Sequence, residues 1–261
     1  IKLDSKFTDA YDNRGESYMD IENYEEAVKD FEVVKKLDPL RKWTFCNMGT
    51  SYENLGEYED ALENYDQSIR LDNEYLIAYF NRGICLANFE KYKEAIKNYD
   101  QVIKLDSQYI DAYLNRGKSY LILENFEEAI KNFDKVINLD KKNAWGYNFR
   151  GYCYGELYEY ERGIKDFDQA LKIDPKIEDF HFNRGLCHNM LKKYEKAIND
   201  FDKAIKLNQN FVDPYVQKGD SYKALGRYEE SLAEYKKAAN INDPRSKEIL
   251  KKITDLKIKT I

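Results

Sequence analysis

Features typical of membrane proteins, nucleic-acid binders and enzymes are scarce in this chain of 261 residues. No apolar run approaches the roughly 18 residues of a membrane-spanning helix. The formal net charge is −6, and lysine and glutamate are interleaved, so no basic face is available to a nucleic acid. A glycine-rich phosphate loop and a paired-carboxylate site are both absent. We therefore expect no membrane insertion, no nucleic-acid partner and no enzymatic activity from these residues.

Histidine, with two residues, and cysteine, with four, are also sparse. His181, Cys187 and His188 lie close together in sequence, but no second cluster completes a set of four metal ligands. No histidine is placed to activate Cys46 or Cys85 for nucleophilic catalysis. The sequence therefore predicts no metal site, no catalytic residue and no bound cofactor.

Glycine is infrequent as well, yet seven of the twelve glycines recur at an unbroken spacing of 34 residues. An aromatic residue or histidine stands four residues before each of them, a small residue twelve after, and an aromatic residue sixteen after. These spacings place apolar side chains on one face of each of two amphipathic helices per repeat. One helix pair cannot bury both apolar faces, so the copies are expected to stack on their neighbours. The seven are Gly15, Gly49, Gly83, Gly117, Gly151, Gly185 and Gly219.

The array resembles the tetratricopeptide repeat family, whose W-x2-L-G-x2-Y, A-x3-F and closing-proline marks are matched at most positions of residues 8–245. Tyr, Phe or His replaces the leading Trp, Arg mostly replaces the Leu before the glycine, and the closing proline remains only at Pro39 and Pro175. The resemblance implies an all-α fold, a right-handed superhelical α-solenoid of helix-turn-helix repeats whose first helices line a concave surface. The seven repeats would span 8–41, 42–75, 76–109, 110–143, 144–177, 178–211 and 212–245.

Both ends of the chain carry repeat-like sequence. Residues 1–7 match the last seven residues of a repeat, which predicts the end of a truncated preceding repeat and a chain cut from a longer protein. Residues 246–261 place apolar side chains at a helical period among lysines, which predicts a C-terminal capping helix.

The cysteines follow the repeat too. Cys85, Cys153 and Cys187 take a repeat position that holds serine elsewhere, which indicates small buried side chains. Equivalent positions in stacked repeats are farther apart than the roughly 7 Å between Cα atoms that a disulfide allows. We therefore expect free thiols, which favour a cytoplasmic location.

The resemblance further implies that positions 2, 5, 6, 9, 12 and 13 of each repeat line the concave face. An asparagine side chain can bridge the C=O and N–H groups of an extended peptide. A row of them resembles the asparagine ladders of the O-linked N-acetylglucosamine transferase and kinesin light chain families. The alternative is that each asparagine bonds the neighbouring helix. Position 6 carries such a row, Asn13, Asn47, Asn81, Asn115 and Asn183.

The other face positions change in character along the chain. Position 5 lacks the lysine that a carboxylate clamp for chaperone tails requires. Acidic residues gather in the first repeat at Asp9, Asp12 and Glu16. Their charge predicts a protein or peptide ligand that is basic at one end, with apolar anchors behind. Trp43 and Trp145 occupy position 2, away from the structural tryptophan of the family, and are favoured as anchors. The aromatic face residues are Trp43, Phe80, Trp145, Tyr152 and Phe182.

One structural pairing also follows from the repeat. The cation before the glycine stands 16 residues after an aspartate in five repeats, whereas Met48 in this series follows Glu32. We predict ion pairs that join the second helix of one repeat to the first helix of the next. The cations are Arg82, Arg116, Arg150, Arg184 and Lys218.

Together these patterns predict a non-catalytic protein-interaction scaffold that binds an extended peptide or a partner helix in the concave groove. One alternative is a substrate-recruiting arm of a larger enzyme. Another is a self-associating assembly scaffold that joins through its N-terminal face, where Phe7, Tyr11 and Tyr18 are expected to be less protected than their counterparts.

Overall fold

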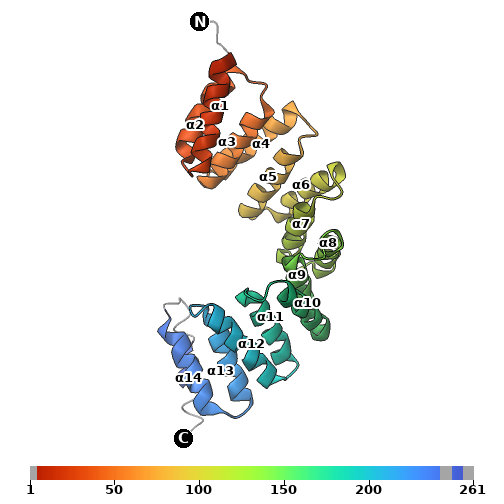
Figure 1. Ribbon diagram of the computed structural model, residues 1–261, viewed down its shortest axis with the longest axis vertical. Helices are drawn as coiled ribbons and strands as arrows, with labels where there is room; N and C mark the ends of the chain where they lie inside the picture. Colours follow the sequence, from red (N-terminus) through yellow and green to blue (C-terminus); the bar gives the residue numbers. More distant parts are fainter. Residues whose placement is uncertain (1–4, 242–248, 255–261) are drawn as a thin grey trace. The chain divides into compact units, whose positions relative to one another are not determined.

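Fourteen α-helices and no strands make up residues 5–241 of the computed structural model, which describes residues 5–241 and 249–254 (Figure 1). Odd-numbered helices are the first helices of the repeats, and even-numbered helices are the second. In chain order they are α1 (Ser5–Asp20), α2 (Tyr24–Leu37), α3 (Lys42–Asn54), α4 (Tyr58–Leu71), α5 (Leu76–Asn88), α6 (Tyr92–Leu105), α7 (Ile110–Ile122), α8 (Phe126–Leu139), α9 (Ala144–Glu156), α10 (Tyr160–Ile173), α11 (Glu178–Met190), α12 (Tyr194–Leu207), α13 (Val212–Ala224) and α14 (Tyr228–Asn240).

The chain divides into two compact units, Ile1–Lys135 and Val136–Ile261. In the first unit each helix from α1 to α7 packs against its neighbour in sequence, and successive first helices also contact one another. The helices α9 to α14 follow the same scheme in the second unit. Each unit is therefore a stack of helix pairs in which the first helices form one continuous layer. This is the all-α solenoid arrangement that the sequence predicts.

A tight turn joins the two helices of every repeat at position 15. In the first repeat the Asn23 N–H donates to the Tyr18 carbonyl over 2.8 Å, and the Glu22 N–H donates to the Met19 carbonyl over 2.9 Å. These bonds satisfy carbonyls at the end of α1 that would otherwise lack a partner. The turn requires one residue in the left-handed conformation in each repeat. The φ angle of this residue is 57–62° in the five repeats where it is not glycine and 75–80° in the two where it is glycine. The seven are Glu22, Gly56, Glu90, Glu124, Tyr158, Lys192 and Gly226.

Each repeat glycine faces the ring of the second-helix aromatic residue sixteen positions later. A Cβ atom added to Gly15 would lie 2.6 Å from Cε1 of Phe31, and one added to Gly219 would lie 2.5 Å from Cε1 of Tyr235. The corresponding distance is 2.6–3.0 Å in the other five repeats. Real Cβ atoms do not come closer than 3.0 Å, so glycine is needed for the ring to pack on the first helix.

The second unit ends in a short helical segment at 249–254. Ile249 and Ile253 of this segment are buried against Tyr235 of α14, so they cover part of the last helix pair. The rest of the capping helix predicted at 246–261 lies outside the described residues. At the other end, residues 1–4 are also outside them, and Ser5–Phe7 form the start of α1.

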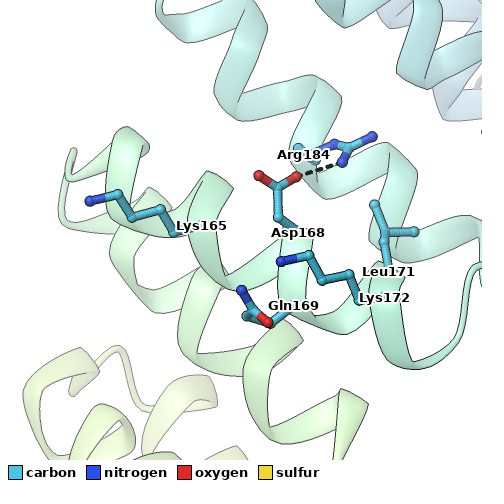
Figure 2. Close-up of a pocket in the computed structure, with 6 residues that line it drawn as sticks. All are labelled: Lys165, Asp168, Gln169, Leu171, Lys172 and Arg184. Carbon is cyan, nitrogen blue, oxygen red and sulfur yellow. Dashed lines mark hydrogen bonds and ion pairs between the residues drawn. The ribbon is translucent and has the colours of Figure 1, made fainter.

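Four of the predicted ion pairs between neighbouring repeats are present among the described residues. In Arg184, Nη1 lies 2.6 Å from Oδ1 of Asp168, so α11 is tied to α10 (Figure 2). The pair lines a pocket of about 320 Å³ together with Lys165 and Lys172. The prediction is also confirmed for the pairs Arg82–Asp66 at 2.9 Å, Lys218–Asp202 at 2.6 Å, and Arg116–Asp100.

A second partner for these cations was not predicted. It lies 16 residues after the cation, on the second helix of the same repeat. Arg184 reaches Asp200 through Nη2 at 2.6 Å, and Asp200 is buried. In the third and fourth repeats an asparagine takes this place, as in the 2.8 Å bond from Arg116 Nε to Asn132 Oδ1. The charged pairs are Arg14–Asp30 at 2.6 Å, Arg150–Asp166 at 2.7 Å, Arg184–Asp200 at 2.6 Å and Lys218–Glu234 at 3.1 Å.

Candidate functional site

Three of the four position-6 asparagines of the first unit bond the protein itself. Asn47 Nδ2 donates to Glu16 Oε1 over 3.1 Å, and Asn81 Nδ2 donates to Thr50 Oγ1 over 3.3 Å. Asn115 Nδ2 donates to a carbonyl of its own helix over 2.9 Å, and Asn13 is exposed. An amide offers two N–H donors and one acceptor. Asn81 Nδ2 also reaches Cys46 Sγ at 3.7 Å, but these hydrogen bonds leave the side-chain acceptor oxygen of each amide with capacity for a peptide N–H.

The acidic residues of the first repeat are only partly open to a ligand. Asp12 is buried and accepts hydrogen bonds from Trp43 Nε1 at 2.9 Å and Thr44 Oγ1 at 3.0 Å, with Arg41 Nη1 at 3.4 Å. Arg41 also pairs with Asp9 at 2.6 Å. This carboxylate therefore holds α1 to the start of α3, and a ligand contact at Asp12 stays a prediction.

Trp43 is 43% exposed although its indole N–H is bonded to Asp12. Its ring also lies 5.7 Å from the Arg41 guanidinium carbon. Phe80, which was predicted to lie on the same face, packs instead on Tyr99 and Tyr109 with ring centroids 6.2 Å and 5.0 Å away. Trp43 thus presents an aromatic surface on the first unit, whereas the half-buried Phe80 packs on rings of its own repeat.

The same difference between an exposed tryptophan at position 2 and a packed phenylalanine at position 5 is found in the second unit. Trp145 is 40% exposed, stacks on Phe149 at 5.5 Å and meets Phe180 edge-on at 5.1 Å. Phe182, at the position equivalent to Phe80, packs on Phe201 and Phe211 with centroids 5.9 Å and 5.0 Å away. The aromatic residues at position 2 are therefore the exposed ones, and those at position 5 are half-buried.

A hollow of about 330 Å³ opens on the first-helix layer of the second unit. Asn183 lies in its wall and donates to Asn148 Oδ1 over 3.0 Å. Tyr152 and Asn183 were predicted for this face. Glu156, Met190 and Tyr158 were not, although counting to position 13 identifies the first two. The hollow is lined by Tyr152, Gly155, Glu156, Tyr158, Tyr160, Phe167, Asn183, Leu186, Cys187, Met190 and Gln217.

The two histidines lie close to the carboxylate of Asp200, one of the acidic partners in the ion pairs described above. His188 Nε2 and His181 Nδ1 are 3.8 Å and 4.0 Å from the oxygens of Asp200, which also pairs with Arg184. Burial lowers the pKa of both imidazoles, despite the opposing effect of this carboxylate. Among the described residues, no group of three or more His, Cys, Asp or Glu side chains could hold a metal ion.

The four cysteines are free and buried, and burial raises the pKa of each thiol to about 12. A thiol with so high a pKa carries almost no thiolate at neutral pH and is a poor nucleophile. Within the part of the chain that the structure describes, no helix is both long and apolar enough to cross a membrane.

Family models for the tetratricopeptide repeat match almost the whole chain. Two described as "Tetratricopeptide repeat" match residues 43–75, 110–143 and 178–211, and 8–39, 146–177 and 212–244; one described as "TPR repeat" matches 90–123. The chain belongs to the tetratricopeptide repeat (TPR) family. Comparison with curated proteins finds no match.

Solved structures of similar fold are TPR proteins. A tetratricopeptide repeat protein from Parabacteroides merdae is 18% identical with a TM-score of 0.73, over 97% of this chain and 99% of that one. YrrB, described as a TPR protein with an unusual peptide-binding site, is 22% identical with a TM-score of 0.58, over 73% and 99%. MamA from Desulfovibrio magneticus is 22% identical with a TM-score of 0.61, over 65% and 96%. TPR arrays of this kind commonly serve as non-enzymatic protein-interaction scaffolds.

Proposed function

We propose that the protein binds an extended peptide segment of a partner protein along the first-helix layer of its repeats. The observation that carries the proposal is the hollow in the second unit. It is lined from three successive first helices, by position 6 of α11 and α13, position 9 of α9 and α11, and position 13 of α9 and α11. A ligand in it would therefore contact side chains from several repeats at once.

The chemistry of this face suits a peptide better than a small metabolite. Amides at position 6 can hydrogen-bond a peptide backbone, while Trp43 and Trp145 offer large apolar surfaces. The hollow is open, and its apolar wall contains Leu186 and Met190. A partner helix is the second candidate for this face, and the exposed tryptophans favour it equally.

Two further candidates concern assembly. Phe7 at the start of α1 is 63% exposed, which favours self-association through the N-terminal face. A role as the substrate-recruiting arm of a larger enzyme is compatible with the same groove. Light scattering at several protein concentrations distinguishes self-association from a monomeric binding module.

The proposal is tested by selecting peptides from a random displayed library against the full chain and measuring their affinity by calorimetry. Trp43→Ala and Trp145→Ala should each weaken a selected peptide about tenfold or more, because truncating an aromatic anchor costs about 2 kcal/mol. Tyr228→Ala is the matched control, since Tyr228 is also 40% exposed but begins the second helix α14. Equal losses in all three variants, or losses only in Tyr228→Ala, would place binding elsewhere.

A further inference from the structure

The hollow in the second unit has an unusual combination of aromatic rings and one acidic group. Tyr152 and Glu156 belong to α9, Tyr158 lies in the following turn, Tyr160 begins α10, and Met190 ends α11. None of the residues that line it is lysine or arginine. The hollow therefore presents several π surfaces and a single carboxylate, with no cation of its own among its lining residues.

The charge of Glu156 acts on the hollow itself. Burial raises the pKa of Tyr152, and Glu156, which accepts a hydrogen bond from its hydroxyl, raises it further. Tyr160 and Cys187 lie elsewhere in the lining. Burial is the largest cause of their raised pKa values, and the charge of Glu156 is a further cause. A negative potential inside the hollow attracts a positively charged group of a ligand.

Tyr158 is an unusual residue for its position in the turn. It adopts the left-handed conformation, with φ of 62°, which costs a residue with a Cβ atom about 1 kcal/mol or more. Its ring is 77% exposed and meets Tyr160 edge-on, with centroids 6.2 Å apart and planes at 86°. The other six residues at this repeat position are glutamate, glycine or lysine. The fifth repeat thus places a large aromatic ring beside the hollow where the turn itself needs none.

We propose that this hollow is a subsite for an arginine side chain of the bound peptide, an inference that rests on the proposed function. A guanidinium group can stack on the tyrosine faces, and its paired N–H donors match the two oxygens of the Glu156 carboxylate. Lysine carries the charge but lacks the planar shape, so it fits less well. A purely apolar side chain would remove water from Glu156 without replacing its hydrogen bonds.

The three methionines allow a direct test. Met190 lines the hollow, whereas Met19 and Met48 belong to the first unit, where Met48 is fully buried. The probe is the peptide acetyl-Gly-Gly-Arg-Gly-Gly-amide, titrated into the full chain labelled with ¹³C at the methionine methyl groups. The Met190 methyl signal should shift saturably, while the Met48 signal stays in place. The same peptide with citrulline, which is neutral and has almost the same shape, should bind at least tenfold more weakly.

Charge variants separate a specific contact from general attraction. Glu156→Gln should weaken the arginine peptide about tenfold, because it removes the charged acceptor. Glu161→Gln is the matched control, since Glu161 is an exposed acidic residue of α10 that does not line the hollow. Equal effects of the two variants would overturn the proposal, and so would equal binding of the citrulline peptide or an unshifted Met190 signal. If peptides selected from the library bind through the tryptophans without any dependence on arginine, only this subsite proposal fails and the proposed function stands.

Discussion

The packing of the repeat glycines leads to a pair of substitutions with opposite effects on stability. Gly185 and Gly155 are both helical residues of the second unit. A Cβ atom at Gly185 would lie 2.7 Å from Cε1 of Phe201, whose ring is fully buried and cannot move aside. At Gly155 the nearest atom would be Cys187 Sγ at 3.6 Å, which is ordinary contact. The same chemical change therefore meets a steric clash at one site and an ordinary van der Waals contact at the other.

The expected magnitudes follow from two competing effects. Alanine is better than glycine inside a helix by about 1 kcal/mol, so Gly155→Ala should stabilise the protein by up to that amount. Overpacking a core costs about 1–3 kcal/mol, so Gly185→Ala should cost about 2 kcal/mol at most after the helix gain is subtracted. We therefore expect the two variants to move the free energy of unfolding in opposite directions.

Urea denaturation followed by far-UV circular dichroism measures both changes. The midpoint should rise for Gly155→Ala and fall for Gly185→Ala, and amides of α11 and α12 should exchange faster in the second variant. A repeat array need not unfold in one step, so the exchange rates locate the change within the chain. A higher midpoint for Gly185→Ala would show that the Phe201 ring yields, and the glycine would then have another explanation.

Three other predictions concern the turn, the ion pairs and the histidines. Glu90→Gly should raise the thermal midpoint, since a left-handed residue with φ of 59° gains about 1 kcal/mol from glycine. Arg184→Met should cost about 3 kcal/mol in urea denaturation because it removes both hydrogen bonds that Arg184 donates to the buried Asp200, and Arg82→Met should cost less because its same-repeat partner is a neutral asparagine. An equal loss would contradict this reasoning. Burial lowers the pKa of His181 and His188 in the folded state below the ordinary value of 6.5. As the pH falls, the unfolded state therefore binds protons before the folded state does. The free energy of unfolding should decrease from about pH 6.5 down to the pKa values of the folded state. The double change of both histidines to Tyr should reduce this dependence between pH 7 and pH 5, and an unchanged slope would assign it to other groups.

The repeat architecture could be predicted from the sequence because the packing rule is the same in every copy. A glycine and an aromatic residue sixteen positions apart describe one contact, which the structure shows seven times. The ion pair from Arg184 back to Asp168 was predictable for the same reason, since charge at one position accompanies charge at the other. The second partner of Arg184 was not predicted, because the position that supplies it holds an acidic residue in some repeats and asparagine in others, as Asp200 and Asn132 illustrate.

The site was less predictable because a face position can be used by the fold in one repeat and left open in another. Position 5 was predicted to face a ligand at Asp12 and Phe182, and in the structure Asp12 also bonds the start of α3 while Phe182 also packs on two rings of its own repeat. Sequence spacing gives the direction of a side chain but not the partners that its own repeat and the neighbouring repeat supply. Trp43 and Trp145 remained exposed because position 2 lies at the start of the first helix, where less of the neighbouring repeat covers it.

The left-handed turn residue shows how a departure from a structural preference can indicate function. Glycine would be the least strained choice at position 15, and two repeats use it. Tyr158 keeps the strain of this conformation and adds an exposed ring next to the hollow. The strain itself does not distinguish the fifth repeat, because four other non-glycine residues share this conformation, but the large exposed ring does. The fifth repeat therefore differs from its neighbours where folding does not require it, which is why the hollow beside Tyr158 is the first place to look for a ligand.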